Sequence, residues 1–372
     1  MRLIFFSLLL IPFKGFSQDH YLFIGTYTGS GSKGIYVYKF NSQTGKATWV
    51  SNTDTSSASN PSYLSVSPNG KYVYAVHEDG NQKNGNVAAY SFNRSTGDLK
   101  LINKQPSGGD HPCYVAISAN NKWVAVANYT GGSASVFAAN IDGSLKPDPQ
   151  VVQHEGKSVV PQRQDKPHVH STVFSPKGDY LFVSDLGIDK VMIYKFNPAS
   201  AKPLQTNATF AESAPGSGPR HFTFHPNNKY AYLIEELTGT VVAYKFTNGK
   251  LNFLQRIAAH PEDYKGTIGS ADIHVSPDGK FLYASNRGDE NTIAIFSINS
   301  ATGTLKSAGY QSTMGKTPRN FMIDPTGNFL LVANQNSNNI VVFKRNKSTG
   351  LLTATESEIE VPRPVCLKMI KK

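Results

Sequence analysis

Hydrophobic and polar residues alternate along this chain in short runs, and the runs recur as one unit. Each unit contains an alternating strand, a turn of the Ser-Pro-Asn-Gly kind and a second alternating strand, which is the pattern of a β-hairpin. The residue that opens the turn in the six copies is Ser67, Ser118, Ser175, His225, Ser276 and Asp324. The copies are therefore separated by 51, 57, 50, 51 and 48 residues. A period of about 50 residues is typical of propeller blades.

Two further strands follow each hairpin. Residues 190–197 (KVMIYKFN) are an example of the third strand, and residues 98–104 (DLKLINK) are an example of the short fourth strand that follows a Thr-Gly or Asp-Gly turn. Four antiparallel strands make one propeller blade. The apolar alternation in these strands serves core packing and indicates no function by itself.

The two ends of the chain complete the ring. Residues 21–50 match the second, third and fourth strands of a unit but have no first strand before them, and residues 362–370 supply that strand from the other end. A blade built from both termini leaves no open sheet edge. We therefore predict an all-β, seven-bladed β-propeller with four-stranded antiparallel blades, closed by the C-terminal strand joining the N-terminal blade. Residues 18–372 would form this single domain.

The first 17 residues differ from the repeats. They begin with Arg2, continue through an apolar run and end in small residues, which is typical of a signal peptide cleaved before Gln18. The apolar run is too short for an ordinary transmembrane helix, and no later segment is continuously apolar over about 20 residues. We expect an exported protein, periplasmic or extracellular, with no membrane partner.

Composition narrows the possible partners. The 372 residues include 37 Lys and Arg against 26 Asp and Glu, a net charge of +11 that fits nucleic acid, an anionic membrane or small anions. The basic residues are scattered, without a dense run or an aromatic stacking platform, so we expect no nucleic-acid partner. Cys113 and Cys366 are too few for a disulfide framework and lack the spacing of a zinc or redox site. A closed ring needs no partner for stability, so we expect a monomer.

One mouth of the central channel should collect two columns of residues, because the first strand of a hairpin starts beside the end of the second. The start column is Ser62, Cys113, His170, Arg220, Ala271, Arg319 and, through the closure, Arg363. The end column, taken as two adjacent positions in each unit, is Thr26 and Tyr27, His77 and Glu78, Asn128 and Tyr129, Asp185 and Leu186, Glu235 and Glu236, Asn286 and Arg287, and Asn334 and Gln335.

These columns are rich in charged residues for positions that should be partly buried. Burying a charge is costly unless it is paired or binds a ligand, and guanidinium groups match carboxylate and phosphate. The arginines at this mouth therefore predict an anionic ligand, and Glu236 and His170 are candidates for proton transfer. A structural alternative stays open, in which the same groups form ion pairs that lock neighbouring blades together.

A long segment, residues 154–170, makes the third spacing the longest and extends a loop on the same mouth. Extra loop length beside a cavity often serves binding, and Arg163 and His168 could reach over the channel, although a solvated loop with incidental charge would look the same. His168 and His170 share a face of an extended strand and could make half a metal site. No third ligand is evident, so we predict no metal.

Four segments resemble the seven-bladed propeller lactonases, a family that includes the propeller-type 6-phosphogluconolactonases and the fungal carboxy-muconate lactonising enzymes. They are residues 21–28 (YLFIGTYT), 167–191 (PHVHSTVFSPKGDYLFVSDLGIDKV), 216–237 (GSGPRHFTFHPNNKYAYLIEEL) and 271–288 (ADIHVSPDGKFLYASNRG). The likeness runs over nearly the whole chain after the first 17 residues. It implies the same propeller fold and a site at one channel mouth.

The resemblance also implies the site residues and the reaction. The family's His, two Arg and Glu fall on His170, Arg220, Arg287 and Glu236, which the two columns already contain. They imply hydrolysis of a sugar lactone, an aldonolactone or 6-phosphogluconolactone, by activated water, with an anionic small-molecule substrate and no cofactor. We add as candidate substrate-binding residues Arg319, Arg163, His168, Glu235 and Asn334.

Three alternatives remain open from the sequence. The muconate branch of the family closes and opens lactone rings with similar groups, and a non-catalytic propeller would use the same arginines to bind an anionic glycan or a protein. A simple anion receptor gains nothing from a carboxylate at its mouth, so Glu236 favours the enzyme. Export separates the chain from cytoplasmic 6-phosphogluconolactone, so the substrate could be an unphosphorylated lactone.

Overall fold

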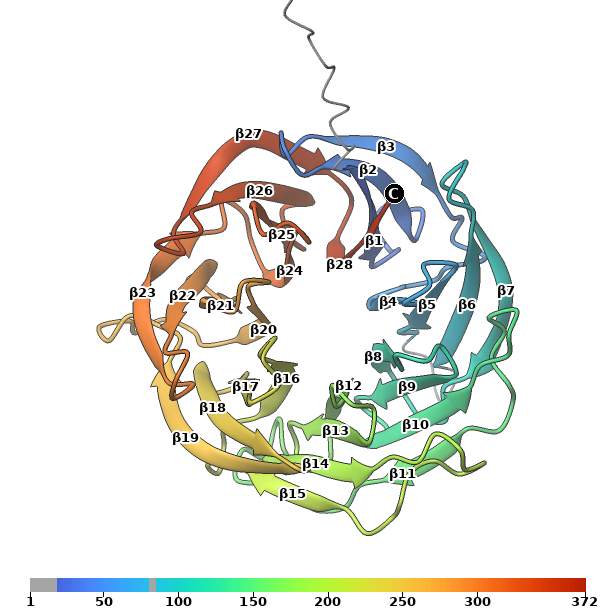
Figure 1. Cartoon of the computed structure of the whole chain (residues 1–372), viewed down its shortest axis with the longest axis horizontal. Helices are drawn as coiled ribbons and strands as arrows, with labels where there is room; N and C mark the ends of the chain where they lie inside the picture. The colour runs from blue at the N-terminus through green and yellow to red at the C-terminus, as the bar shows by residue number, and fades with distance from the viewer. Residues whose placement is uncertain (1–18, 80–84) are drawn as a thin grey trace, which may run out of the picture.

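Seven four-stranded antiparallel sheets surround a central channel in the part of the chain that the computed structural model describes, residues 19–79 and 85–372 (Figure 1). The predicted all-β, seven-bladed propeller is confirmed. The predicted signal peptide and its cleavage before Gln18 lie outside the described residues. No helix within those residues is long and apolar enough to cross a membrane.

Each blade contributes one strand to each of four concentric positions. The strands that line the channel are β4 (Leu64–Val66), β8 (Pro112–Ile117), β12 (Val169–Phe174), β16 (Pro219–Phe224), β20 (Ser270–Val275), β24 (Pro318–Ile323) and β28 (Pro364–Lys371). The second strands are β1 (Asp19–Thr26), β5 (Tyr72–His77), β9 (Trp123–Asn128), β13 (Tyr180–Asp185), β17 (Tyr230–Glu235), β21 (Phe281–Asn286) and β25 (Phe329–Asn334).

The outer half of each blade is less buried than the inner half. The third strands are β2 (Tyr36–Asn41), β6 (Asn86–Phe92), β10 (Ser133–Ala138), β14 (Lys190–Lys195), β18 (Thr240–Thr247), β22 (Thr292–Ile298) and β26 (Asn339–Arg345). The fourth strands form the rim and are β3 (Ala47–Asn52), β7 (Leu99–Pro106), β11 (Gln150–Gln153), β15 (Thr209–Glu212), β19 (Lys250–Ala258), β23 (Leu305–Ser312) and β27 (Leu352–Glu360).

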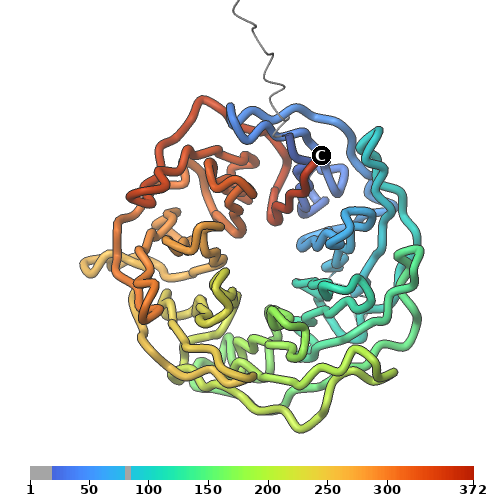
Figure 2. The backbone as a smooth tube through the Cα atoms, viewed as in Figure 1, coloured from blue at the N-terminus to red at the C-terminus, as the bar shows by residue number. Residues whose placement is uncertain are grey.

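The ring closes through the two ends of the chain, as predicted. Strand β28 pairs antiparallel with β1, with Leu22 opposite Met369 and Ile24 opposite Leu367, so the last strand becomes the innermost strand of the first sheet (Figures 1 and 2). This pairing removes the open edge that β1 would otherwise present.

Buried aromatic residues join neighbouring blades. Phe182 of β13 stacks on Phe222 of β16 with 5.3 Å between ring centroids, and Phe23 of β1 meets Phe92 of β6 edge to face at 4.8 Å. A buried aromatic side chain removes about 150 to 250 Å² from water, which is worth about 4 to 6 kcal/mol as an upper estimate. Apolar contacts of this kind hold neighbouring blades together.

The inner strands share an irregularity at their start. In β8, β12, β16 and β24 the register with the second strand shifts by one residue, which leaves an extra residue on the inner strand. The extra residues are Cys113, His170, Arg220 and Arg319. A β-bulge bends the strand and re-aims the side chain that it carries. The bulges thus place the start column of the sequence at the channel mouth.

The turns at the other end of the hairpins are structural. Gly279 has a φ of +69°, a conformation that L side chains rarely adopt, and its carbonyl oxygen lies 2.8 Å from Nε2 of His225 in the neighbouring blade. His225, which directly follows β16, therefore ties its turn to the neighbouring blade through this hydrogen bond.

Candidate active site

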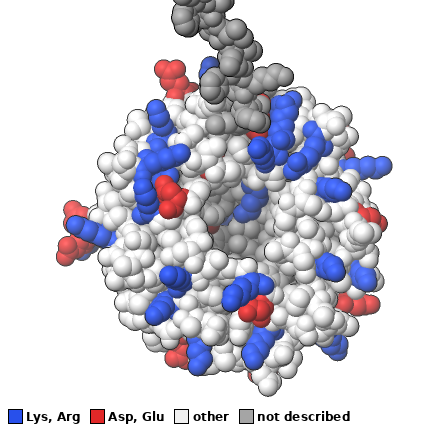
Figure 3. Space-filling model, in the orientation of Figure 1, with Lys and Arg blue, Asp and Glu red and all other residues white. Residues whose placement is uncertain are grey.

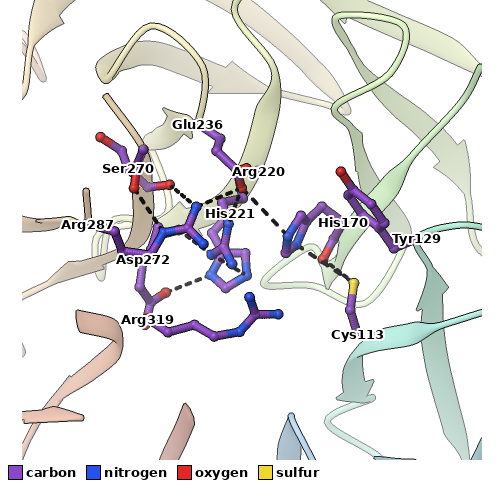
Figure 4. Close-up of polar contacts among 12 residues, drawn as sticks. Cys113, Tyr129, His170, Arg220, His221, Glu236, Ser270, Asp272, Arg287 and Arg319 are labelled. Atoms are coloured by element: carbon purple, nitrogen blue, oxygen red, sulfur yellow. Dashed lines mark hydrogen bonds and ion pairs between the residues drawn. The ribbon is translucent and has the colours of Figure 1, made fainter. Parts of the chain in front are cut away.

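A cavity of about 380 Å³ occupies the channel mouth where the bulged residues lie. It is lined by Glu78, Cys113, Tyr129, Arg163, His170, Glu236, Gly269, Arg287 and Arg319. Figure 4 shows six of these side chains around the cavity: Cys113, His170 and Arg319 come from inner strands, and Tyr129, Glu236 and Arg287 directly follow second strands. On the face drawn in Figure 3, Lys and Arg are spread around the hollow centre and do not gather in one run.

The two adjacent positions of the end column have different roles. Tyr129, Glu236 and Arg287 are second members of their pairs, and all line the cavity. The first members point the opposite way, into the blades, because successive side chains of an extended strand alternate between faces. Asn128, for example, donates hydrogen bonds from Nδ2 to Oγ of Ser133 at 3.1 Å.

Glu236 is the centre of the site. Its Oε1 lies 2.5 Å from Nη2 of Arg163. Its Oε2 accepts a hydrogen bond of 2.7 Å from Nε of Arg220 and lies 3.1 Å from Nη2 of Arg287 (Figure 4). The Glu236 side chain is only 7% exposed. An isolated buried carboxylate is unfavourable by several kcal/mol, and three guanidinium groups offset that penalty.

The charges around Glu236 determine its protonation state. Burial alone would raise the pKa of Glu236, but Arg287, Arg220, His170 and Arg163 together hold it well below its usual value. Burial also lowers the pKa of Arg287, to about 10, although Glu236 opposes the shift. At neutral pH the site therefore contains a carboxylate and protonated guanidinium groups, with an excess of positive charge.

His170 is the second titratable group of the cavity. Burial, and then the positive charge of Arg220, lower its pKa well below the usual value, so the imidazole is neutral at pH 7. Its Nε2 lies 3.9 Å from Oε2 of Glu236, and its Nδ1 lies 3.8 Å from Sγ of Cys113. Neither distance is that of a strong hydrogen bond, so the imidazole keeps its capacity to bind a proton.

The opposite wall of the cavity carries a second cluster. Arg319 approaches Oε2 of Glu78 to 3.8 Å and lies over the ring of Tyr27, whose hydroxyl donates to Glu78 at 2.9 Å. Burial, with Glu78 nearby, raises the pKa of Cys113 well above its usual value, so this thiol stays protonated and is no nucleophile.

The long loop brings Arg163 over the cavity, as the sequence indicated. Gln164 anchors the loop from below by donating from Nε2 to Oδ1 of Asp189 at 2.8 Å. Arg163 itself is 40% exposed and is the most accessible of the arginines that contact Glu236. His168 does not line the cavity; its ring stacks on Tyr129 at 4.7 Å and supports that side chain.

The structure places several predicted residues away from the cavity. Glu235 pairs inside its blade with Arg256 at 2.9 Å, and Asn334 donates to the carbonyl of Thr313 at 3.1 Å. Both are first members of their pairs, and for this reason they point into the blade. We correct the expectation that they bind substrate. Arg220 is 1% exposed and lies behind Glu236, so it belongs to the cluster without lining the cavity.

Four residues that line the cavity were absent from the predicted catalytic and substrate-binding residues: Glu78, Cys113, Tyr129 and Gly269. Glu78 and Tyr129 both line the cavity, and both belong to the end column that the repeat defines. The signal that could have found them is their position: they are the second members of their pairs, as Glu236 and Arg287 are.

A layer of buried and partly buried side chains closes the channel beneath the cavity. It consists of Tyr114, His221 and Asn320, each of which follows a bulged residue, together with Asp272 of β20 and Tyr63, which precedes β4. The rings of Tyr63 and Tyr114 stack at 4.0 Å, and His221 donates to Asp272 across 2.7 Å. Within the described residues, no three His, Cys, Asp or Glu side chains are grouped so that they could hold a metal ion.

Comparisons with known proteins agree with this architecture. A family model described as lactonase, seven-bladed β-propeller, matches residues 21–369. A 6-phosphogluconolactonase of Formosa agariphila is 46% identical over 94% of this chain and 99% of the relative, and one of Bacillus subtilis is 38% identical over 94% and 97%. The structure of a periplasmic gluconolactonase of Pseudomonas aeruginosa has a TM-score of 0.89 at 37% identity, covering 95% of this chain and 99% of that one.

Fold and site together define a closed propeller with a carboxylate, an imidazole and several guanidinium groups at one channel mouth. The matches extend over almost the whole described chain. The chain belongs to the seven-bladed β-propeller lactonase family, and it is a lactonase.

Proposed function

We propose that this lactonase hydrolyses an anionic sugar lactone at the channel mouth, with His170 as general base and the arginines as anchors for substrate charge. The observation that carries the proposal is the single cavity in which neutral His170 faces a carboxylate, Glu236, and the guanidinium groups of Arg163 and Arg287. A lactone needs an activated water, a stabilised oxyanion and a protonated leaving oxygen, and these groups match those needs.

His170 is better suited than Glu236 to accept the proton from water. Both oxygens of Glu236 are bound by arginines, which leaves the carboxylate less free to accept a proton. His170 is neutral and without a close hydrogen bond on either nitrogen. Glu236, at 3.9 Å, then stabilises the imidazolium that forms when His170 takes the proton.

One proton passes from water to His170 and then to the leaving oxygen of the lactone, so hydrolysis needs no further acid or base. Water attacks the carbonyl carbon of the lactone while His170 accepts its proton, and the oxyanion is stabilised by the guanidinium groups of Arg287 and Arg319, which line the same cavity. The bond from the carbonyl carbon to the ring oxygen then breaks, and the His170 imidazolium returns the proton to that oxygen. The product is the open hydroxy acid.

Arg163 is the proposed anchor for the substrate's own anionic group. It enters from a loop and is the most exposed of the arginines that contact Glu236, so a substrate carboxylate or phosphate can reach its guanidinium group. The relatives support two lactones: those of Formosa agariphila and Bacillus subtilis are named 6-phosphogluconolactonases, and the Pseudomonas aeruginosa structure is of a gluconolactonase.

The test is turnover of glucono-1,5-lactone and its 6-phosphate by the chain beginning at Gln18, with spontaneous opening subtracted. Wild-type turnover that His170→Gln loses by about 100-fold or more supports the proposal. No turnover above buffer on either lactone overturns it. The ratio of kcat/KM for the two lactones identifies the preferred substrate.

We also infer that the chain is exported and acts as a monomer. The sequence pattern of the first 17 residues and the periplasmic location in the name of the Pseudomonas aeruginosa protein support export. N-terminal sequencing of the protein from the periplasm or medium should begin at Gln18. Protein retained in the cytoplasm with Met1 intact would contradict export, and sedimentation as a dimer would contradict the monomer.

A further inference from the structure

His221 and Asp272 form a buried pair directly beneath the proposed catalytic cavity. They belong to the layer that closes the channel, and their side chains are 6% and 2% exposed. Nδ1 of His221 lies 2.7 Å from Oδ1 of Asp272, and Nε2 of His221 lies 3.3 Å from Nη1 of Arg220 (Figure 4). The pair therefore contacts the cluster around Glu236 without lining its cavity.

The chemistry of the neighbours assigns the tautomer of His221. A guanidinium can only donate hydrogen bonds, so Nε2 of His221 must be the acceptor for Arg220. A carboxylate can only accept, so Nδ1 carries the proton and donates to Asp272. Burial and, second, the charge of Arg220 lower the pKa of His221 to about 4. The ring is therefore neutral at neutral pH, and its Nε2 is unprotonated and able to accept.

The pair completes the attachment of Arg220. Nε of Arg220 donates to Glu236 at 2.7 Å, and Nη1 donates to the carbonyl of Ala271 at 2.6 Å and to His221. Both protons of Nη1 are thus used, and the plane of the guanidinium is fixed. Because Arg220 holds Oε2 of Glu236, its orientation sets where that carboxylate lies relative to His170.

We propose that Asp272 and His221 are positioning residues of the lactonase: Asp272 fixes the Nδ1-protonated tautomer of His221, and His221 in turn holds Arg220 so that Glu236 faces His170. This inference rests on the proposed function for its catalytic consequence. Its structural part, the tautomer, stands independently of any substrate.

An isosteric substitution separates positioning from packing. Asp272 accepts at Oδ2 from Phe321 N at 3.3 Å and from Asn320 Nδ2, and at Oδ1 from Ile273 N at 3.0 Å besides His221. In Asp272→Asn the oxygen is favoured on the side with two fixed donors, so the amide NH₂ faces His221. The proton of the His221 ring must then lie on Nε2. This N–H of His221 would face the N–H of Nη1 of Arg220, and the hydrogen bond between the two residues would be lost.

The experiment compares Asp272→Asn with His274→Gln as the matched control. His274 contacts Oδ2 of Asp272 at 2.9 Å from the side away from Arg220 and is 30% exposed. We expect Asp272→Asn to lower kcat about 10- to 100-fold with little change in KM, and His274→Gln to leave both nearly unchanged. If Asp272→Asn folds poorly, His221→Phe takes its place, because it keeps a ring but removes the acceptor. We expect the same loss of kcat in His221→Phe.

A double-mutant cycle with Arg220→Lys tests the route. If the pair acts through Arg220, Asp272→Asn causes little further loss of kcat in the Arg220→Lys background; an undiminished further loss overturns the inference. Nitrogen NMR of the histidine rings should show His221 protonated at Nδ1 in the wild type and at Nε2 in Asp272→Asn. A wild-type ring protonated at Nε2 overturns this inference alone, whereas a wild-type chain without lactone turnover overturns the proposed function alone.

Discussion

Glu235 and Glu236 are adjacent in the chain, but their carboxylates lie in separate ion-pair clusters. Glu235 ends β17 and pairs with Arg256 of β19 inside the blade, and Thr240 donates a further hydrogen bond to it. Glu236 faces the channel and is bound by Arg163 and Arg220. One position along the chain therefore separates an acid inside the blade from an acid at the channel mouth.

The first prediction compares these two acids. Glu236→Gln should lower kcat/KM for the preferred lactone by about 100-fold or more, because the imidazolium of His170 loses its counter-charge. Glu235→Gln should lower Tm, because Arg256 loses a buried partner, and should leave kcat/KM within about twofold.

The measurement is kcat/KM of the wild type and of both variants, at a temperature well below the lowest of the three Tm values. In Glu236→Gln the arginines have no carboxylate partner and can bind phosphate instead. Added phosphate should therefore raise the Tm of this variant more steeply than that of the wild type. Equal kinetic losses in both variants would contradict the distinction.

The second prediction concerns pH. His170 must be unprotonated to act as base, and its folded-state pKa lies well below the ordinary 6.5. Turnover should therefore stay near its plateau as pH falls through 6.5 and should decline only as pH approaches the lowered pKa. A profile of kcat/KM from about pH 4 to 8, with spontaneous opening subtracted, measures this. A half-maximum at or above 6.5 would contradict His170 as the base.

The third prediction concerns Arg163. Arg163→Gln should raise KM for a phosphorylated lactone by roughly tenfold and should affect a neutral lactone less, because the lost guanidinium binds charge and lies at the exposed edge of the cluster. Lys166→Gln, on the same loop and exposed, is the matched control and should leave both KM values unchanged. The same rise in KM for neutral and charged lactones would show that Arg163 does not recognise the anion.

The fourth prediction concerns ring closure. Deleting residues 362–372 should abolish the cooperative thermal transition, because β1 and the face of β24 lose the strand that covers them. Deleting only Lys371 and Lys372 should lower Tm by a few degrees at most, because most of the pairing with β1 remains. Circular dichroism on heating measures both; a cooperative transition in the longer deletion would show that the clasp is dispensable.

The sequence predicted the blades, the closure and the central four residues of the cluster because these follow from a repeat and from a resemblance. It did not predict which of two adjacent residues faces the channel. That choice depends on the residue at which each second strand ends, and residue types do not fix a strand end to within one residue.

One available signal was the repeated asparagine in the end column. Asn128, Asn286 and Asn334 are all first members of their pairs, and each donates from Nδ2 to a backbone carbonyl just after the outer strand of the preceding blade. The same residue in several copies of a repeat indicates a role that the copies share, which is structural.

The bulges have a consequence for how this mouth can change over time. An extra residue in a strand has no partner in the ladder, so its replacement alters neither the pairing nor the register of the sheet. The side chain can therefore be substituted at each bulged position without a change in the strand pairing of the ring. These positions are 113, 170, 220 and 319, which carry a thiol, an imidazole and two guanidinium groups. Selection for a new lactone, in nature or in a directed-evolution library, can act on these positions with the scaffold left intact.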